Sequence, residues 1–171
     1  NIEKNGIIIL NRDDKFFSYL AGKAKFKKIK IVTFGKNKKS DVYPIKTSNN
    51  KNLIKMSVKV KDQNLDLSIK NINIYNLLAS LALLKELNLN LEKIKNIFQN
   101  YEPTEGRGSK HNIKRYNKKF KLIDESYNAN PLSVRNAISN FNLIKKEQFK
   151  KYLILGDMLE LGDKSDMYHK N

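Results

Sequence analysis

The densest group of chemically capable side chains lies late in the chain, directly after a short apolar run. Phe120 to Ile123 has the composition of a strand, and the polar segment Asp124 to Asn128 follows it. Asn130 and Pro131 then predict the start of a helix, because asparagine is a strong N-cap and proline is favoured at the first helical position. Open α/β sheets bind ligands at the carboxyl ends of their strands. We therefore predict a ligand-binding loop here, although Asn130 alone needs no role beyond capping.

A second polar loop follows the next apolar run. Tyr152 to Leu155 predicts a strand, and Gly156 to Gly162 after it contains Asp157 and Glu160. A helix from Pro131 to about Lys145 would join the two strands. Parallel strands with a right-handed crossover end at one edge of a sheet, so we expect both loops to face the same crevice.

Two further candidate residues, Arg107 and Asn76, lie outside these two polar loops. Arg107 lies between Gly106 and Gly108, where its guanidinium could reach a phosphate or could be a solvated linker charge. Asn76 lies at the start of a leucine-rich helix, where it either faces a ligand or is simply exposed. The two histidines, His111 and His169, are too isolated to predict a metal site.

The elements that must position these residues suggest an α/β protein in two parts. The first part should begin with a strand-helix-strand unit, which predicts a parallel pair of strands. Its strands are expected at Gly6 to Leu10 and at Ile29 to Phe34. The helix between them contains Phe16, Phe17, Leu20 and Ala24, with Asp13 or Asp14 as its cap. Alternating segments at 42–46, 53–60 and 65–69 predict an antiparallel meander with Ile54, Met56, Val58 and Val60 on one face. Helices follow from Ile74 to Leu87 and, capped by Asn90, through Phe98. Pro103 and the paired glycines mark a linker, so we predict domains at 1–107 and 108–171.

Composition limits the classes of function. The 171 residues contain no cysteine and carry a net charge of +17. No apolar run approaches the roughly 20 residues that cross a bilayer, so a soluble cytoplasmic protein is expected. The charge also suggests nucleic-acid binding. However, specific phosphate recognition favours arginine, and the chain has only four arginines among its basic residues. The abundant lysine, asparagine and isoleucine favour a codon bias as the source of the charge.

The two loops together resemble a known family. Leu122-Ile123-Asp124-Glu125-Ser126-Tyr127-Asn128-Ala129-Asn130-Pro131 and Gly156-Asp157-Met158-Leu159-Glu160-Leu161-Gly162 resemble the Mur ligases, in particular the members that use D-alanyl-D-alanine. Three shorter segments also match: Leu10-Asn11-Arg12-Asp13-Asp14, Thr33-Phe34-Gly35 and Gly106-Arg107-Gly108. The resemblance thus spans essentially the whole chain.

The resemblance implies a piece of a three-domain enzyme. Residues 1–107 would be the later half of a central ATPase domain, and residues 108–171 the start of a Rossmann-like carboxyl-terminal domain. The chain has no glycine-rich loop ending in Lys-Thr or Lys-Ser. The family's phosphate loop, its Mg²⁺ ligands and its carbamylated lysine would all precede Asn1, so we expect no complete catalytic set here and no activity from this piece alone.

The implied reaction is ATP-driven amide formation through an acyl phosphate, joining D-alanyl-D-alanine to UDP-N-acetylmuramoyl-tripeptide in peptidoglycan precursor synthesis. The complete enzyme is expected to be a monomer. By resemblance, Asn76 would contact adenine, Arg107 the phosphates, and Asp124 or Glu125 the nucleotide. The residues expected on the substrate side are Tyr127, Asn128, Asn130, Asp157 and Glu160.

Two rival classes remain open at this point. One is a basic, non-enzymatic nucleic-acid-binding protein. The other is a different ATP-dependent amide ligase such as a folylpolyglutamate synthase, which would share the architecture but lack the Tyr-Asn-Ala-Asn-Pro segment.

Overall fold

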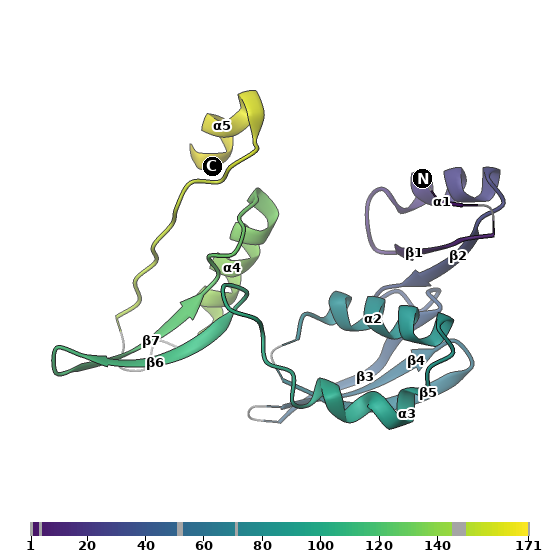
Figure 1. The fold of residues 1–171 in the computed structure, drawn as a ribbon, viewed down its shortest axis with the longest axis horizontal. Helices are drawn as coiled ribbons and strands as arrows, with labels where there is room; N and C mark the ends of the chain where they lie inside the picture. The colour runs from purple at the N-terminus through teal and green to yellow at the C-terminus, as the bar shows by residue number, and fades with distance from the viewer. Residues whose placement is uncertain (1, 4, 51–52, 71, 145–149, 171) are drawn as a thin grey trace. The chain divides into compact units, whose positions relative to one another are not determined.

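A computed structural model of the chain describes residues 2–3, 5–50, 53–70, 72–144 and 150–170. They belong to two compact units, Asn1–Glu102 and Pro103–Asn171 (Figure 1). The division falls within the predicted linker, a few residues before the predicted boundary at residue 107. Which domains of a larger protein these units represent stays a prediction.

Unit 1 is built on a five-stranded sheet in the order β1-β2-β3-β4-β5. Its strands are β1 (Ile7–Asn11), β2 (Lys30–Phe34), β3 (Val42–Asn50), β4 (Leu53–Val60) and β5 (Gln63–Ile69). β1, β2 and β3 are parallel, and β3, β4 and β5 are antiparallel. Continuous apolar runs thus became parallel strands and alternating ones the meander, as predicted. The α/β fold class is confirmed.

The core of unit 1 lies between the sheet and helix α2 (Ile74–Glu86). Leu77, Leu78 and Leu81 are buried on one face of α2 because residues three and four apart share a helix face. The sheet contributes Met56, Val58 and Val60 from the predicted inner face of β4, whereas Ile54 is only partly buried. Asn90 caps α3 (Leu91–Ile94), which continues into the 3-10 helix η1 (Lys95–Phe98).

The expectation that Asp13 or Asp14 caps helix α1 (Phe17–Phe26) is wrong. Its N-cap is Phe16, without a side-chain capping bond, whereas Asp14 accepts a hydrogen bond from Phe16 N and Asp13 bonds to a different loop. The buried residues of α1 are Ala21 and Ala24. Small alanines let the helix lie close to the β1–β2 strands, while Tyr19 and Phe26 are exposed.

Unit 2 differs most from the prediction. It contains a hairpin, β6 (Ser109–Arg115) and β7 (Lys118–Asp124), then α4 (Pro131–Leu143), the 3-10 helix η2 (Gly162–Lys164) and α5 (Ser165–Lys170). The predicted strand Tyr152–Leu155 is not formed: its side chains are exposed, Ile154 at 92%, and no strand is assigned between 150 and 170. An apolar run becomes a strand only when another strand pairs with it, and among the described residues β7 pairs with β6 alone. The predicted parallel pair in this unit is therefore wrong.

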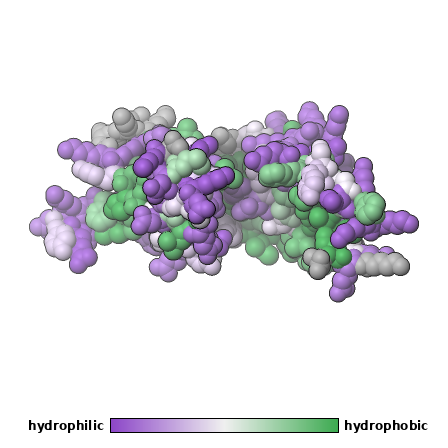
Figure 2. Space-filling model, turned by 90° about the horizontal axis from the view of Figure 1, so that it is seen from above, coloured by the Kyte–Doolittle hydropathy of each residue, from purple (hydrophilic) through white to green (hydrophobic). Residues whose placement is uncertain are grey.

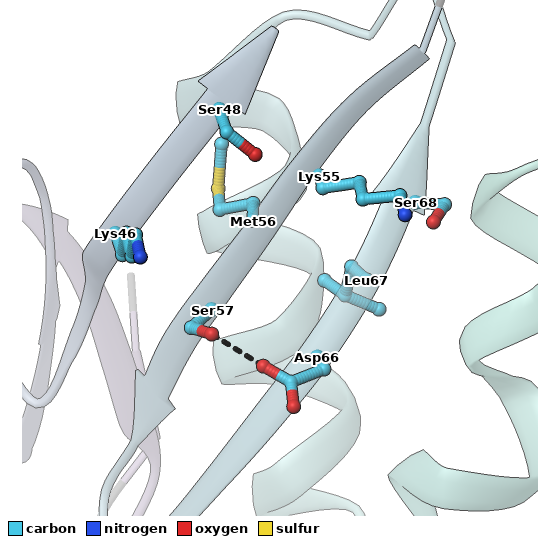
Figure 3. Close-up of a pocket in the computed structure, with 8 residues that line it drawn as sticks. All are labelled: Lys46, Ser48, Lys55, Met56, Ser57, Asp66, Leu67 and Ser68. Atoms are coloured by element: carbon cyan, nitrogen blue, oxygen red, sulfur yellow. Dashed lines mark hydrogen bonds between the residues drawn. The ribbon is translucent and has the colours of Figure 1, made fainter. Parts of the chain in front are cut away.

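The surface is mostly hydrophilic on the face seen in Figure 2. A shallow hollow of about 340 Å³ lies on the outer face of the meander. Lys46, Lys55 and Ser68 line it together with Ser57, whose hydroxyl donates a hydrogen bond to Asp66 (Figure 3). Of the helices that the structure describes, none is both long and apolar enough to cross a membrane.

Candidate functional site

The glycine-flanked Arg107 turn is held against the end of β7 by backbone hydrogen bonds. Gly108 N donates to Asp124 O at 2.8 Å, and Tyr127 N donates to Gly106 O at 3.1 Å. The bonds lie on either side of Arg107, so this residue and the Asp124–Tyr127 loop are fixed relative to each other. The structure thus brings Arg107 together with Asp124 and Tyr127, which lie 17 and 20 positions later in the sequence.

The close approach requires glycine at position 106, and positive φ angles favour glycine at both flanking positions. Gly106 has φ +74°, and a Cβ built on it would lie 2.8 Å from Tyr127 N and 2.9 Å from Tyr127 Cβ. Gly108 has φ +85°, and a Cβ there would lie 3.3 Å from Glu125 Oε1. Residues other than glycine adopt such angles at a cost. The pair therefore builds a tight turn, which is a different role from the mobile linker that the sequence suggested.

Arg107 stacks on an aromatic ring from the facing loop. Its guanidinium carbon lies 4.2 Å from the centroid of the Tyr127 ring. Tyr127 is 66% exposed, so the stack lies at the surface and leaves the guanidinium edge accessible. An Arg fork held by its flat face can still offer its N–H groups to phosphate or carboxylate oxygens.

The adjacent carboxyl groups have opposite electrostatic environments. Hydrogen bonds from the Ser126 side chain and backbone N–H, the latter 3.0 Å from Asp124 Oδ1, lower the pKa of Asp124. Desolvation of the Glu125 carboxyl, whose Oε1 lies against Gly108, and then repulsion from Asp124 raise the pKa of Glu125. Asp124 is thus the more readily ionised of the two and the better acceptor for hydroxyl or amine donors.

The two asparagines that follow have local partners. Asn130 caps α4 through bonds from Leu132 N and Ser133 N, and Ser133 completes a capping box. This confirms its predicted capping role. Asn128 Oδ1 accepts a hydrogen bond from Ala129 N at 2.8 Å, which leaves its NH₂ group as the available donor.

The Gly156–Gly162 loop is not placed by a sheet edge, because the parallel strand pair on which that expectation rested is absent. Asp157 and Glu160 are both exposed. Met158 between them is buried, and its backbone N–H donates to His169 Nε2 at 2.8 Å. Glu160 has φ +60°, a left-handed conformation that is unusual for glutamate.

Asn76 lies in unit 1, in the first turn of α2, and is exposed. Asn73 caps this helix by accepting bonds from Tyr75 N and Asn76 N. Beside it, the Lys36 ammonium lies 5.3 Å from the centroid of the Tyr75 ring. Burial and the nearby Asp13 carboxylate raise the pKa of the Tyr75 phenol.

The arrangement of Asp13, Lys36 and Tyr75 was not predicted from the sequence. Asp13 accepts bonds from Lys36 N at 2.5 Å and Asn37 N at 3.2 Å, so it links the loops after β1 and β2. One signal in the sequence could have indicated this contact. Parallel strands end at the same edge of a sheet, so the loops that follow β1 and β2 must lie near each other.

Two other features could have formed part of the candidate site: a group of metal-binding side chains and the hollow on the meander. Across the described parts of the chain, no three His, Cys, Asp or Glu side chains group to hold a metal ion. The hollow in Figure 3 is lined by none of the residues expected in the site.

Comparison with known proteins gives a consistent relationship. Residues 1–84 match the model of the Mur ligase middle domain. The chain is 32% identical over 176 aligned positions to the UDP-N-acetylmuramoyl-tripeptide–D-alanyl-D-alanine ligase of Buchnera aphidicola, covering 99% of this chain and 36% of that protein. This chain therefore spans about a third of the length of that relative.

Solved structures show the same fold. MurF from Acinetobacter baumannii matches with a TM-score of 0.76 and 24% identity, over 98% of this chain and 35% of that one. MurF from Thermotoga maritima, solved in complex with ADP, matches with a TM-score of 0.74 and 19% identity, over 98% and 37% of the respective chains. The matched domain, the sequence similarity over nearly the whole chain and the shared fold all relate this chain to the Mur ligases.

Proposed function

We propose that this chain forms part of an ATP-dependent ligase that adds D-alanyl-D-alanine to UDP-N-acetylmuramoyl-tripeptide in the cytoplasm. The observation that carries the proposal is the 32% identity to such a ligase across 99% of the chain. It favours this reaction over that of a folylpolyglutamate synthase, as does the Tyr127–Pro131 segment in its capped loop. The complete enzyme acts as a monomer and forms the amide through an acyl phosphate.

In this proposal the residues divide between nucleotide and acceptor. Arg107, presented by its tight turn and supported by Tyr127, binds nucleotide phosphates. Asp124, the more readily ionised carboxylate, accepts bonds from the nucleotide, with Glu125 beside it. Asn76 contacts adenine from the first turn of α2.

The acceptor side is formed by the remaining polar residues. The free NH₂ group of Asn128 donates to a carboxylate or carbonyl oxygen of the dipeptide. Asp157 and Glu160 receive its amine from the Gly156–Gly162 loop, while Asn130 holds the start of α4 in place.

Bound ATP supplies the phosphoryl group that activates the tripeptide carboxyl, and Mg²⁺ neutralises phosphate charge in such transfers. The exposed Arg107 fork and the Asp124 carboxylate fit a nucleotide chemically. By contrast, the described residues contain no cluster of three metal-binding side chains, so we assign no Mg²⁺ ligand to this chain.

A segment exchange tests the proposal. The 171 residues would replace the aligned segment of the Buchnera aphidicola ligase, and phosphate release would be measured with and without D-alanyl-D-alanine. We expect release that requires both the dipeptide and the nucleotide-linked tripeptide. A chimera that folds and binds the tripeptide substrate, yet releases no dipeptide-dependent phosphate, would overturn the proposal.

A matched pair of substitutions sharpens the experiment. Arg107→Ala is expected to raise the KM for ATP about tenfold or more, because it removes a charge-assisted hydrogen bond to the nucleotide. Arg115→Ala is the control, because Arg115 also stacks on a tyrosine, Tyr116, at 5.2 Å, but on the hairpin turn. We expect its KM for ATP to stay within about twofold of the parent, as for a surface residue.

The same variants test the nucleic-acid alternative that the charge of +17 suggests. Binding of arbitrary duplexes that falls steeply with salt, and is unchanged by Arg107→Ala or Asp124→Ala, would favour that alternative. The isolated 171-residue chain is expected to show no dipeptide-dependent phosphate release.

A further inference from the structure

His169 has two hydrogen-bond partners that impose the same protonation state. Its Nδ1 lies 2.9 Å from the carbonyl oxygen of Ser165, one turn earlier in α5. A carbonyl oxygen can only accept, so Nδ1 carries the proton. The other nitrogen, Nε2, lies 2.8 Å from Met158 N, whose hydrogen it can accept only when unprotonated.

This bond joins the Gly156–Gly162 loop to a residue eleven positions later in the chain. Met158 is buried, whereas its neighbours Asp157 and Leu159 are exposed. The loop is therefore anchored at its middle by one buried side chain and one backbone hydrogen bond. Its acidic residues, Asp157 and Glu160, are exposed.

The loop also contains strained backbone next to the anchor. Glu160 has φ +60°, and Gly162 has φ +57°, so the chain passes twice through the left-handed region within three residues. Glycine tolerates this conformation and glutamate does so only at a cost, so surrounding contacts must hold it. The contact to His169 lies two residues before Glu160.

We propose that His169 is a positioning residue: in its neutral, Nδ1-protonated form it holds Met158 N and so fixes the directions of Asp157 and Glu160 towards the dipeptide. The part of this that concerns the dipeptide rests on the proposed function. The imidazole acts through the loop backbone and does not contact substrate.

The first test uses the 171-residue chain and needs no activity. Nitrogen chemical shifts of the His169 ring at neutral pH are expected to show protonated Nδ1 and bare Nε2. Amide exchange at Met158 should be about fivefold faster or more in His169→Leu, since the net worth of one hydrogen bond is lost. His169→Gln should restore much of the protection, because its side-chain oxygen can replace Nε2 as acceptor. Lys170→Gln, a change at the next residue of α5, should leave Met158 exchange unchanged.

The second test uses the chimeric ligase. His169→Leu is expected to raise the KM for D-alanyl-D-alanine about fivefold or more, with kcat and the KM for ATP little changed, and His169→Gln to reverse most of the effect. Unchanged Met158 exchange in His169→Leu, or an Nε2-protonated ring, would overturn the anchor. Altered exchange with an unchanged KM for the dipeptide would overturn its role towards substrate. A parent chimera without dipeptide-dependent activity would instead overturn the proposed function and leave the anchor standing.

Discussion

The tight turn at Gly106 provides a sharp test of how unit 2 is held together. In Gly106→Ala the new methyl group would start 2.8 Å from Tyr127 N, and Tyr127 cannot simply withdraw because this same nitrogen donates to Gly106 O. The left-handed conformation costs alanine about 1–2 kcal/mol. Overpacking against backbone adds about 1–3 kcal/mol, for a total of roughly 2–5 kcal/mol.

Amide exchange measures this loss directly. The protected N–H groups of Gly108 and Tyr127 bracket the turn, and a loss of 2 kcal/mol raises the opening equilibrium by about thirtyfold. The same substitution should separate the Arg107 guanidinium from the Tyr127 ring, because both are positioned by the turn.

Gly156→Ala is the matched control in the same unit. No atom lies within 4 Å of a Cβ built at Gly156 and its φ is not left-handed, so its effect should stay within about 0.5 kcal/mol. Equal protection in Gly106→Ala and the parent, or an equal loss in both variants, would refute the steric reasoning.

Two further substitutions test the electrostatics. Hydrogen bonds from two lysines lower the pKa of Glu86, so its contribution to stability is complete above the ordinary carboxyl pKa and is lost as the pH falls through the lowered value. Glu86→Gln should therefore destabilise unit 1 by about 2 kcal/mol near pH 7, which is the scale of hydrogen bonds to a charged group. In urea unfolding curves this difference in unfolding free energy should shrink at acid pH. A difference that does not change with pH would contradict the prediction. For Glu125 the sign is reversed: its raised pKa means that stability falls as the carboxyl ionises above its ordinary pKa of 4.5. Glu125→Gln should thus raise the melting temperature of unit 2 at neutral pH and not at acid pH, and a lower melting temperature at pH 7 would count against both desolvation of the carboxylate and its repulsion from Asp124.

Local signals predicted much of the fold. Asn90 and Asn130 were identified as caps because their side chains satisfy N–H groups wherever a helix starts, whatever surrounds it. The alternation in β4 predicted its buried face because the side-chain period of a strand is fixed. These features depend on neighbouring residues, which the sequence gives directly.

Features that depend on a distant partner were not predictable in the same way. β6 was missed because it contains a single large apolar residue, Ile113, and is a strand only through its pairing with β7. Its turn did leave a signal, since Tyr116 and Asn117 are both left-handed, as in two-residue hairpin turns that favour asparagine. Conversely, Tyr152 to Leu155 had the composition of a strand and lacked the partner.

The candidate site divides along the same line. The loop Asp124–Asn128 was found from its polar residues after an apolar run. The stacking of Arg107 on Tyr127 was not, because it depends on two glycines that let backbone segments touch. The anchor at His169 was also missed, because a lone histidine gives no hint of an acceptor role towards a backbone N–H.

Helix α2 is attached to its surroundings at both ends. At its start, Tyr75 lies beneath Lys36 from the loop after β2. At its end, Glu86, with a side chain only 7% exposed, pairs with Lys30 of β2 and with Lys61. Thirteen residues at about 1.5 Å each make a strut of roughly 20 Å between these attachments. Any shift of α2 along its axis would therefore disturb the contacts at both of its ends, and Asn76, in its first turn, lies between them.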